Sequence, residues 1–163
     1  MEAPDAGSVD LGGVALPVAG PSWREVALLP QSLGLLEELT VRENVTLPLR
    51  LDPVAPAADV DGLLVGLGLD LLADRFPHEI SLGEQQRTAL ARAAVVRPRL
   101  LLAHEPISHQ NRAWAERTIE VIGELAAAGT ACVLATHDEL ATAVAGRVLE
   151  LRDGQLRLTV RPA

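Results

Sequence analysis

The chain has 163 residues, of which 48% are hydrophobic and 22% charged, and its formal net charge at pH 7 is −8. This composition suits one folded domain with a sizeable core and excludes a disordered tail. It also argues against a nucleic-acid partner, because a duplex-binding surface needs a basic patch. The single cysteine excludes an intramolecular disulfide framework. All 14 basic residues are arginine, so any mechanism that needs a lysine from this chain is excluded.

The first half of the chain begins with a stretch rich in glycine and proline, which we predict to be irregular. A strand, a helix, a linker and a glycine-weakened helix are then predicted at residues 24–31, 39–51, 52–59 and 60–76. Within the first of these helices, Thr40 is a suitable N-cap, and Glu43 stands three positions later, as in a capping box. No apolar run in the chain reaches the roughly 18 residues of a membrane span.

The second half alternates between helix and strand patterns. Helices are predicted at 81–96, 112–129 and 138–145, strands at 99–103 and 130–137, and a hairpin at 147–158. Ser81 and Glu84 have the spacing of a second capping box, and Gly129 is suitable as a helix C-cap. The two strands are continuously apolar, which is typical of burial on both faces. This alternation predicts an α/β fold with a mostly parallel sheet flanked by helices.

Four stretches, in this order, resemble the ATP-binding cassette ATPases, the motor subunits of ABC transporters. They are ALLPQSLGLLEELTVRENVTLPL (the Q-loop), ISLGEQQRTALARAAVVRP (the signature motif), LLLAHEPISHQN (Walker B and the D-loop) and VLATHD (the H-loop). The first is most similar to exporters of the lipoprotein-release and macrolide-export type. With PDAGSVDLGG at the start, the resemblance covers nearly the whole chain.

The resemblance implies an incomplete P-loop NTPase fold in a single truncated domain, residues 1–163. A helical subdomain with the signature motif would span about residues 35–97, and the Walker B to H-loop part of the catalytic core would span 98–163. The family's phosphate-binding glycine loop, with its lysine, would lie before residue 1. Because that loop cradles the phosphates, we expect the chain to lack a complete nucleotide site.

Three residues match the family's catalytic positions. By resemblance, Glu105 is the general base that polarises the attacking water, and His137 is the switch histidine that contacts the γ-phosphate. Gln31 would touch Mg²⁺ and the attacking water. Without the resemblance, Gln31 is only a polar residue at a strand end, and an isolated histidine such as His137 is more often a capping or packed residue.

The signature positions are Ser81, Leu82, Gly83 and Glu84. In the family this motif binds the γ-phosphate of ATP held by the other subunit, with a serine hydroxyl and glycines that allow a close approach. Leu82 replaces the first glycine, and a branched side chain there would crowd the phosphate. The alternative is a capped helix with no phosphate contact.

Two further substitutions concern the metal and the D-loop. His104 stands where the family has the Mg²⁺-binding aspartate, and imidazole suits transition metals better than Mg²⁺. We therefore expect weak Mg²⁺ binding there, with Gln31 as a second possible contact. The other histidines form no compact ligand motif with His104. Asn111 replaces the D-loop aspartate and removes its charge.

The resemblance implies a subunit that couples ATP and Mg²⁺ to export through a membrane permease, together with a second cassette in a homo- or heterodimer. Such a subunit would be cytoplasmic and peripheral at the inner face of the cell membrane. The substitutions predict that this chain is degenerate and does not hydrolyse ATP alone. Two alternatives stay open. One is a non-enzymatic module that pairs with an intact cassette, and the other is a truncated gene or a misplaced start.

Overall fold

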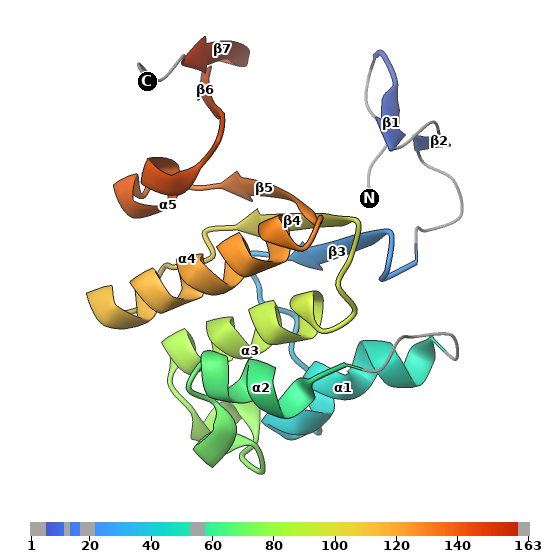
Figure 1. The fold of residues 1–163 in the computed structure, drawn as a ribbon, viewed down its shortest axis with the longest axis vertical. Helices are drawn as coiled ribbons and strands as arrows, with labels where there is room; N and C mark the ends of the chain where they lie inside the picture. Colours follow the sequence, from blue (N-terminus) through green and yellow to red (C-terminus); the bar gives the residue numbers. More distant parts are fainter. Residues whose placement is uncertain (1–5, 12–13, 17–21, 53–57, 160–163) are drawn as a thin grey trace.

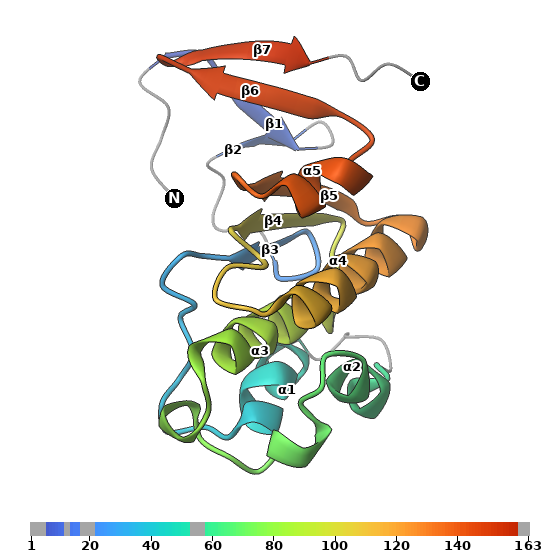
Figure 2. The ribbon, with the colours of Figure 1, turned by 90° about the vertical axis from the view of Figure 1, so that its left-hand side faces the viewer.

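The computed structural model describes residues 6–11, 14–16, 22–52 and 58–159. Within these ranges the centre is a parallel sheet of β3 (Val26–Leu29), β4 (Leu100–His104) and β5 (Ala131–Ala135), in the order β3-β4-β5. Helices α3 (Leu82–Ala94) and α4 (Arg112–Ala127) lie on one side of this sheet (Figures 1 and 2). The predicted α/β fold with a parallel sheet flanked by helices is confirmed.

Three further helices and two 3₁₀ turns complete the helical part. They are α1 (Val41–Leu51), α2 (Val60–Gly66), α5 (Glu139–Val144) and the turns Asp70–Leu72 and Pro77–Glu79. Thr40 and Ser81 cap α1 and α3, and each is part of a capping box, as predicted. The helix predicted over 60–76 is broken after Gly66, because Gly68 adopts a φ of +63° and a Cβ at this position would lie 2.0 Å from the Trp114 ring.

The core lies between the sheet and α3, and continues among α1, α2 and α3. Leu90 of α3 and Leu29 and Leu101 of the sheet are fully buried. Each such leucine stabilises the fold by about 1.5–3 kcal/mol relative to an exposed one. On the other side of α3, the buried apolar residues are Val41, Val45, Leu64, Leu67 and Leu69. The helix that carries the signature residues is therefore held on several sides.

The prediction that the strand at 130–137 is buried on both faces is wrong. Cys132 and Leu134 pack against the core, but Ala131, Val133 and Ala135 are exposed, with Val133 at 56%. Because side chains alternate along a strand, the exposed residues share the face that points away from α4. Both α3 and α4 lie on the same side of the sheet, so neither covers this face.

Two hairpins lie on the other side of the sheet from α3 (Figures 1 and 2). The C-terminal one, β6 (Val148–Arg152) and β7 (Gln155–Thr159), was predicted and is confirmed. Asp153 and Gly154 both have positive φ, as a two-residue type I′ turn requires. The other, β1 (Val9–Leu11) with β2 (Val14–Leu16), lies in the stretch predicted to be irregular, so that prediction is wrong there. Short apolar strands separated by glycines explain it.

Helix α4 ends slightly earlier than predicted. Its C-cap is Ala128, and Gly129 follows in the left-handed conformation that often terminates helices. Among the described residues, no helix is both long enough and apolar enough to cross a membrane.

Candidate functional site

The parallel register gathers the predicted catalytic residues at one edge of the sheet. Leu29 pairs with Ala103, so Gln31, two residues after Leu29, is level with Glu105, two residues after Ala103. His104 pairs with Ala135, so Glu105 is level with the residue that precedes His137. Because carboxyl ends of parallel strands meet at the same edge, three separate motifs converge there.

Glu105 and His137 are in direct contact. His137 Nδ1 lies 2.7 Å from Glu105 Oε1, and the His137 backbone N–H donates to the same oxygen at 3.2 Å. The Thr136 hydroxyl donates to Glu105 Oε2 at 3.0 Å. The Glu105 backbone N–H donates to Ala135 O at 2.8 Å, which joins the turn after β4 to the end of β5. Thr136 has no role in the sequence prediction, although it directly precedes the predicted histidine.

The contact shifts the pKa of both residues. Burial raises the pKa of Glu105, but hydrogen bonds from His137 and Thr136 outweigh burial and hold that pKa below its ordinary value of 4.5. The hydrogen bond and charge of Glu105 raise the pKa of His137 above its ordinary value of 6.5. The His137 side chain is 88% exposed, so solvent screens this ion pair. A carboxylate that already accepts several hydrogen bonds is a weak general base.

Gln31 and His104 are both exposed at the same edge. Within the described ranges, neither side chain hydrogen-bonds to another residue. Those ranges also contain no group of three or more His, Cys, Asp or Glu side chains arranged for a metal ion. His104 offers one imidazole, and Glu105 has both oxygens engaged. These donors do not fit Mg²⁺, which needs several oxygen ligands in octahedral geometry, so we derive no step through a metal.

The signature residues lie at the start of α3, against the loop formed by residues 105–111. Ser81 Oγ lies 2.7 Å from Glu84 Oε2, and the same carboxylate oxygen accepts the Ser81 backbone N–H at 2.7 Å. A Cβ on Gly83 would lie 2.7 Å from His109 O, so the glycine is required by this internal contact. Leu82 is 46% exposed beside them. The Ser81 hydroxyl and Glu84 carboxylate are thus engaged with each other.

Asn111 is the N-cap of α4. Its Oδ1 accepts the Trp114 backbone N–H at 3.0 Å. Aspartate at this position would form the same cap, because both side chains are strong N-caps. Asn111 therefore gives the same helix start as an aspartate would, without its negative charge.

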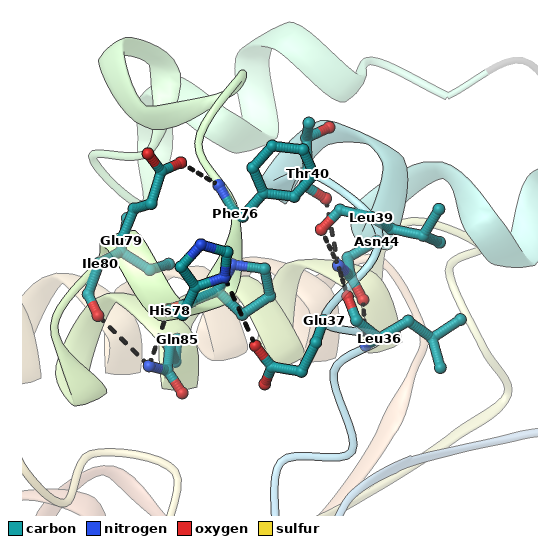
Figure 3. Close-up of polar contacts among 11 residues, drawn as sticks. Leu36, Glu37, Leu39, Thr40, Asn44, Phe76, His78, Glu79, Ile80 and Gln85 are labelled. Carbon is teal, nitrogen blue, oxygen red and sulfur yellow. Dashed lines mark hydrogen bonds and ion pairs between the residues drawn. The ribbon is translucent and has the colours of Figure 1, made fainter.

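Asn44 is a fully buried residue that the sequence analysis did not single out (Figure 3). Its Oδ1 accepts the Leu36 N–H at 2.9 Å, and its Nδ2 donates to Leu36 O, Leu39 O and Thr40 O at 2.9–3.1 Å. It thereby fixes the segment that follows Gln31. The sequence contains no signal for this role, because a polar residue in an amphipathic helix ordinarily faces solvent.

Comparison with known proteins adds the family. Residues 1–108 match the ABC transporter family. This chain belongs to the ABC transporter family. The lipoprotein-releasing system ATP-binding protein LolD of Bordetella pertussis is 37% identical over 169 residues, which cover 96% of this chain and 72% of that protein. The spermidine/putrescine import ATP-binding protein PotA of Chromobacterium violaceum is 40% identical over 161 residues, which cover 96% of this chain but only 45% of that protein. The chain thus spans less than half the length of this import relative.

Solved structures agree with the family assignment. The ATP-binding cassette MJ0796, a dimer in a post-hydrolysis state bound to ADP and Pi, superposes with a TM-score of 0.86 at 24% identity. The match covers 97% of this chain and 75% of that one. A second dimeric structure of that cassette, described as a bacterial ABC transporter cassette, gives a TM-score of 0.75 at 26% identity. The cassette ATPase fold expected from the motifs is confirmed.

Proposed function

We propose that this chain acts as an ATP-binding subunit of an ABC transporter, coupled to a membrane permease, and that it does not hydrolyse ATP by itself. The contact of Glu105 with Thr136 and His137 carries the proposal, because it joins the family's general base and switch histidine. In this proposal the subunit is cytoplasmic and is held at the inner face of the membrane by the permease. In this proposal a nucleotide binds at the edge of the sheet that carries Glu105, and Gln31, at the same edge, faces it.

Three observations support the lack of hydrolysis by the chain alone. The Glu105 carboxylate is engaged by several donors. His104 replaces a hard oxygen ligand, and the 163 residues contain no lysine for the phosphates. Loss of a phosphate clamp or an anchored metal typically removes several kcal/mol of transition-state stabilisation. The same substitution at His104 favours the second candidate function, a non-enzymatic partner of an intact cassette.

The second cassette is the partner for the signature residues. Ser81, Gly83 and Glu84 lie at the N-terminus of a 13-residue helix, whose free N–H groups and dipole favour an anion. We propose that they face ATP held by that cassette. Binding would require the Ser81 hydroxyl to exchange its contact with Glu84 for one with phosphate.

The permease is proposed to contact the surface formed by Leu36, Glu37, Phe76 and His78 (Figure 3). All four side chains are exposed, the Phe76 and His78 rings stack with centroids 5.8 Å apart, and His78 Nδ1 lies 4.0 Å from Glu37 Oε2. Exposed aromatic and apolar side chains are common at protein interfaces. This surface is continuous with the segment after Gln31, so a contact here would reach the nucleotide edge of the sheet.

The transporter type is proposed from the Q-loop pattern and from the match to LolD, which covers most of that protein. Both favour export of the lipoprotein-release type. PotA, an import protein, has the higher sequence identity to this chain, 40%, but the match covers only 45% of PotA. We therefore assign no substrate.

ATP-dependent association tests the proposal. The purified chain is mixed with an intact cassette from the same organism, with and without ATP, and the complexes are measured by analytical ultracentrifugation. We expect a heavier complex only with ATP, and we expect Ser81→Arg to abolish it. Thr40→Arg is the matched control, because Thr40 caps α1 through a capping box of the same type and is not a signature position. No ATP-dependent complex, or one unaffected by Ser81→Arg, would contradict the proposal.

A further inference from the structure

Gln86 is a buried amide on α3 that connects this helix to the turn bearing Glu105. Its side chain is only 3% exposed. Its Nε2 donates to the backbone carbonyl of Glu105 and, at 2.8 Å, to Ser108 Oγ. The resemblance assigns Gln86 no role, and it bonds to the backbone carbonyl of Glu105, whereas the Glu105 carboxylate bonds to Thr136 and His137. It is thus placed to control the turn through the backbone.

The turn needs such a support because Glu105 has a φ of +45°. That region is disfavoured for residues other than glycine. The Glu105 carbonyl also accepts the Ser108 N–H at 3.2 Å and the Ser108 hydroxyl at 3.1 Å. With Gln86, three donors converge on one carbonyl. Backbone held in this way persists only when its surroundings over-determine it.

Gln86 is itself oriented by a network of side chains, of which Thr118 is fully buried and Gln110 is half-buried. Its Oε1 accepts from Gln110 Nε2 at 3.5 Å, and Gln110 Nε2 also donates to Pro106 O at 3.1 Å. The Thr118 hydroxyl of α4 donates to Gln110 Oε1 at 2.9 Å. The network therefore joins α3, the loop at 105–111 and α4. Satisfied polar networks of this kind rigidify the groups that they connect.

We propose that Gln86 is a positioning residue, which fixes the turn at 105–108 so that the Glu105 carboxylate faces Thr136 and His137. The role of Glu105 beside a nucleotide rests on the proposed function, whereas the geometric claim does not. Gln86 touches no reacting atom and acts only through Glu105.

The neighbouring residue provides a matched control. Gln85 also donates its side-chain amide to two backbone carbonyls, Pro77 O at 2.9 Å and Ile80 O at 3.2 Å (Figure 3). It is on the same helix and has the same chemistry, but it supports the turn before the signature motif. Gln85→Met and Gln86→Met therefore remove equivalent groups from different turns.

Amide hydrogen exchange and ¹⁵N–¹H spectra of the full chain test the claim. The His137 N–H donates to Glu105 Oε1, so its protection reports whether the carboxylate is in place. In Gln86→Met we expect this protection to fall roughly tenfold, with shifted resonances at residues 105–108. In Gln85→Met we expect changes at 77–81 and none at His137. An unchanged His137 amide in Gln86→Met, or equal changes in both variants, would overturn the proposal.

A second variant keeps the test decisive. If Gln86→Met does not fold, Ser108→Ala removes another donor to the Glu105 carbonyl, and a smaller change at the His137 amide is expected. No change in that variant would overturn the proposal. An assembly that hydrolyses no ATP would contradict the proposed function, while the spectra would still decide the role of Gln86.

Discussion

At the scale of single residues, the pairing of Glu105 with His137 makes the stability of the fold depend on pH. Glu105 has a lowered pKa, so its contribution is present above 4.5 and is lost as pH falls through the lower folded value. His137 has a raised pKa, so its contribution is complete below 6.5 and is lost as pH rises through the higher folded value. We expect the Tm difference between wild type and Glu105→Gln to be largest between pH 4.5 and pH 6.5, the ordinary pKa values of the two side chains. A difference that is constant across pH would contradict the pairing.

Asn44 provides a second residue-scale prediction. Asn44→Leu keeps the branched shape of the side chain but leaves the backbone groups of the segment at 36–40 without their partners, so we expect a loss of about 1–3 kcal/mol. Urea unfolding measures it. Thr46→Val is the control, because Thr46 Oγ1 bonds only to carbonyls of its own helix, at Arg42 and Glu43. A similar small loss in both variants would show that Asn44 does not hold the segment.

The residue scale is also where sequence analysis was least complete. The order of motifs led to Glu105 and His137, because short strands deliver residues to one edge of a parallel sheet. Their direct contact, and the roles of Gln86 and Asn44, depend on burial between elements distant in sequence. Whether Gln31, Ser81 and Glu84 act on a nucleotide remains a prediction.

At the scale of elements, Gly83 shows how α3 is docked against the loop that follows Glu105. Gly83→Ala would bring a Cβ to 2.7 Å from a backbone carbonyl, so we expect it to destabilise the fold by about 1–3 kcal/mol. Gly123 lies inside α4, and a Cβ there would meet no other part of the protein within 4 Å. Gly123→Ala should therefore stabilise the fold by about 0.5–1 kcal/mol. Thermal unfolding of both variants decides it. Equal effects would mean that the loop accommodates the methyl group.

Elements with local signals were predicted best. The caps at Thr40 and Ser81 and the turn at Asp153 depend on residues close in sequence, and all three are present. The burial of β5 was not predictable from its apolar run, because it depends on which face the helices cover. The hairpin of β1 and β2 was missed because its strands are only three residues long.

At the scale of the whole molecule, the fold follows from strand and helix alternation, and the family follows from four motifs in order. The proposed division into a helical part at 35–97 and a core part at 98–163 remains a prediction. So does the degeneracy of the nucleotide site, which depends on what His104 and Leu82 do in an assembled transporter. The partner subunits contribute residues of their own to that assembly, and these residues are not part of this sequence.

ATP hydrolysis by the purified chain is the measurement that tests the central claim most directly. Phosphate release is followed with ATP and Mg²⁺, for wild type and for Glu105→Gln, with EDTA as the metal-free control. The engaged Glu105 carboxylate, His104 at the metal position and the absence of lysine predict no release above background in either protein. Mg²⁺-dependent hydrolysis by the wild type that Glu105→Gln abolishes would contradict the account.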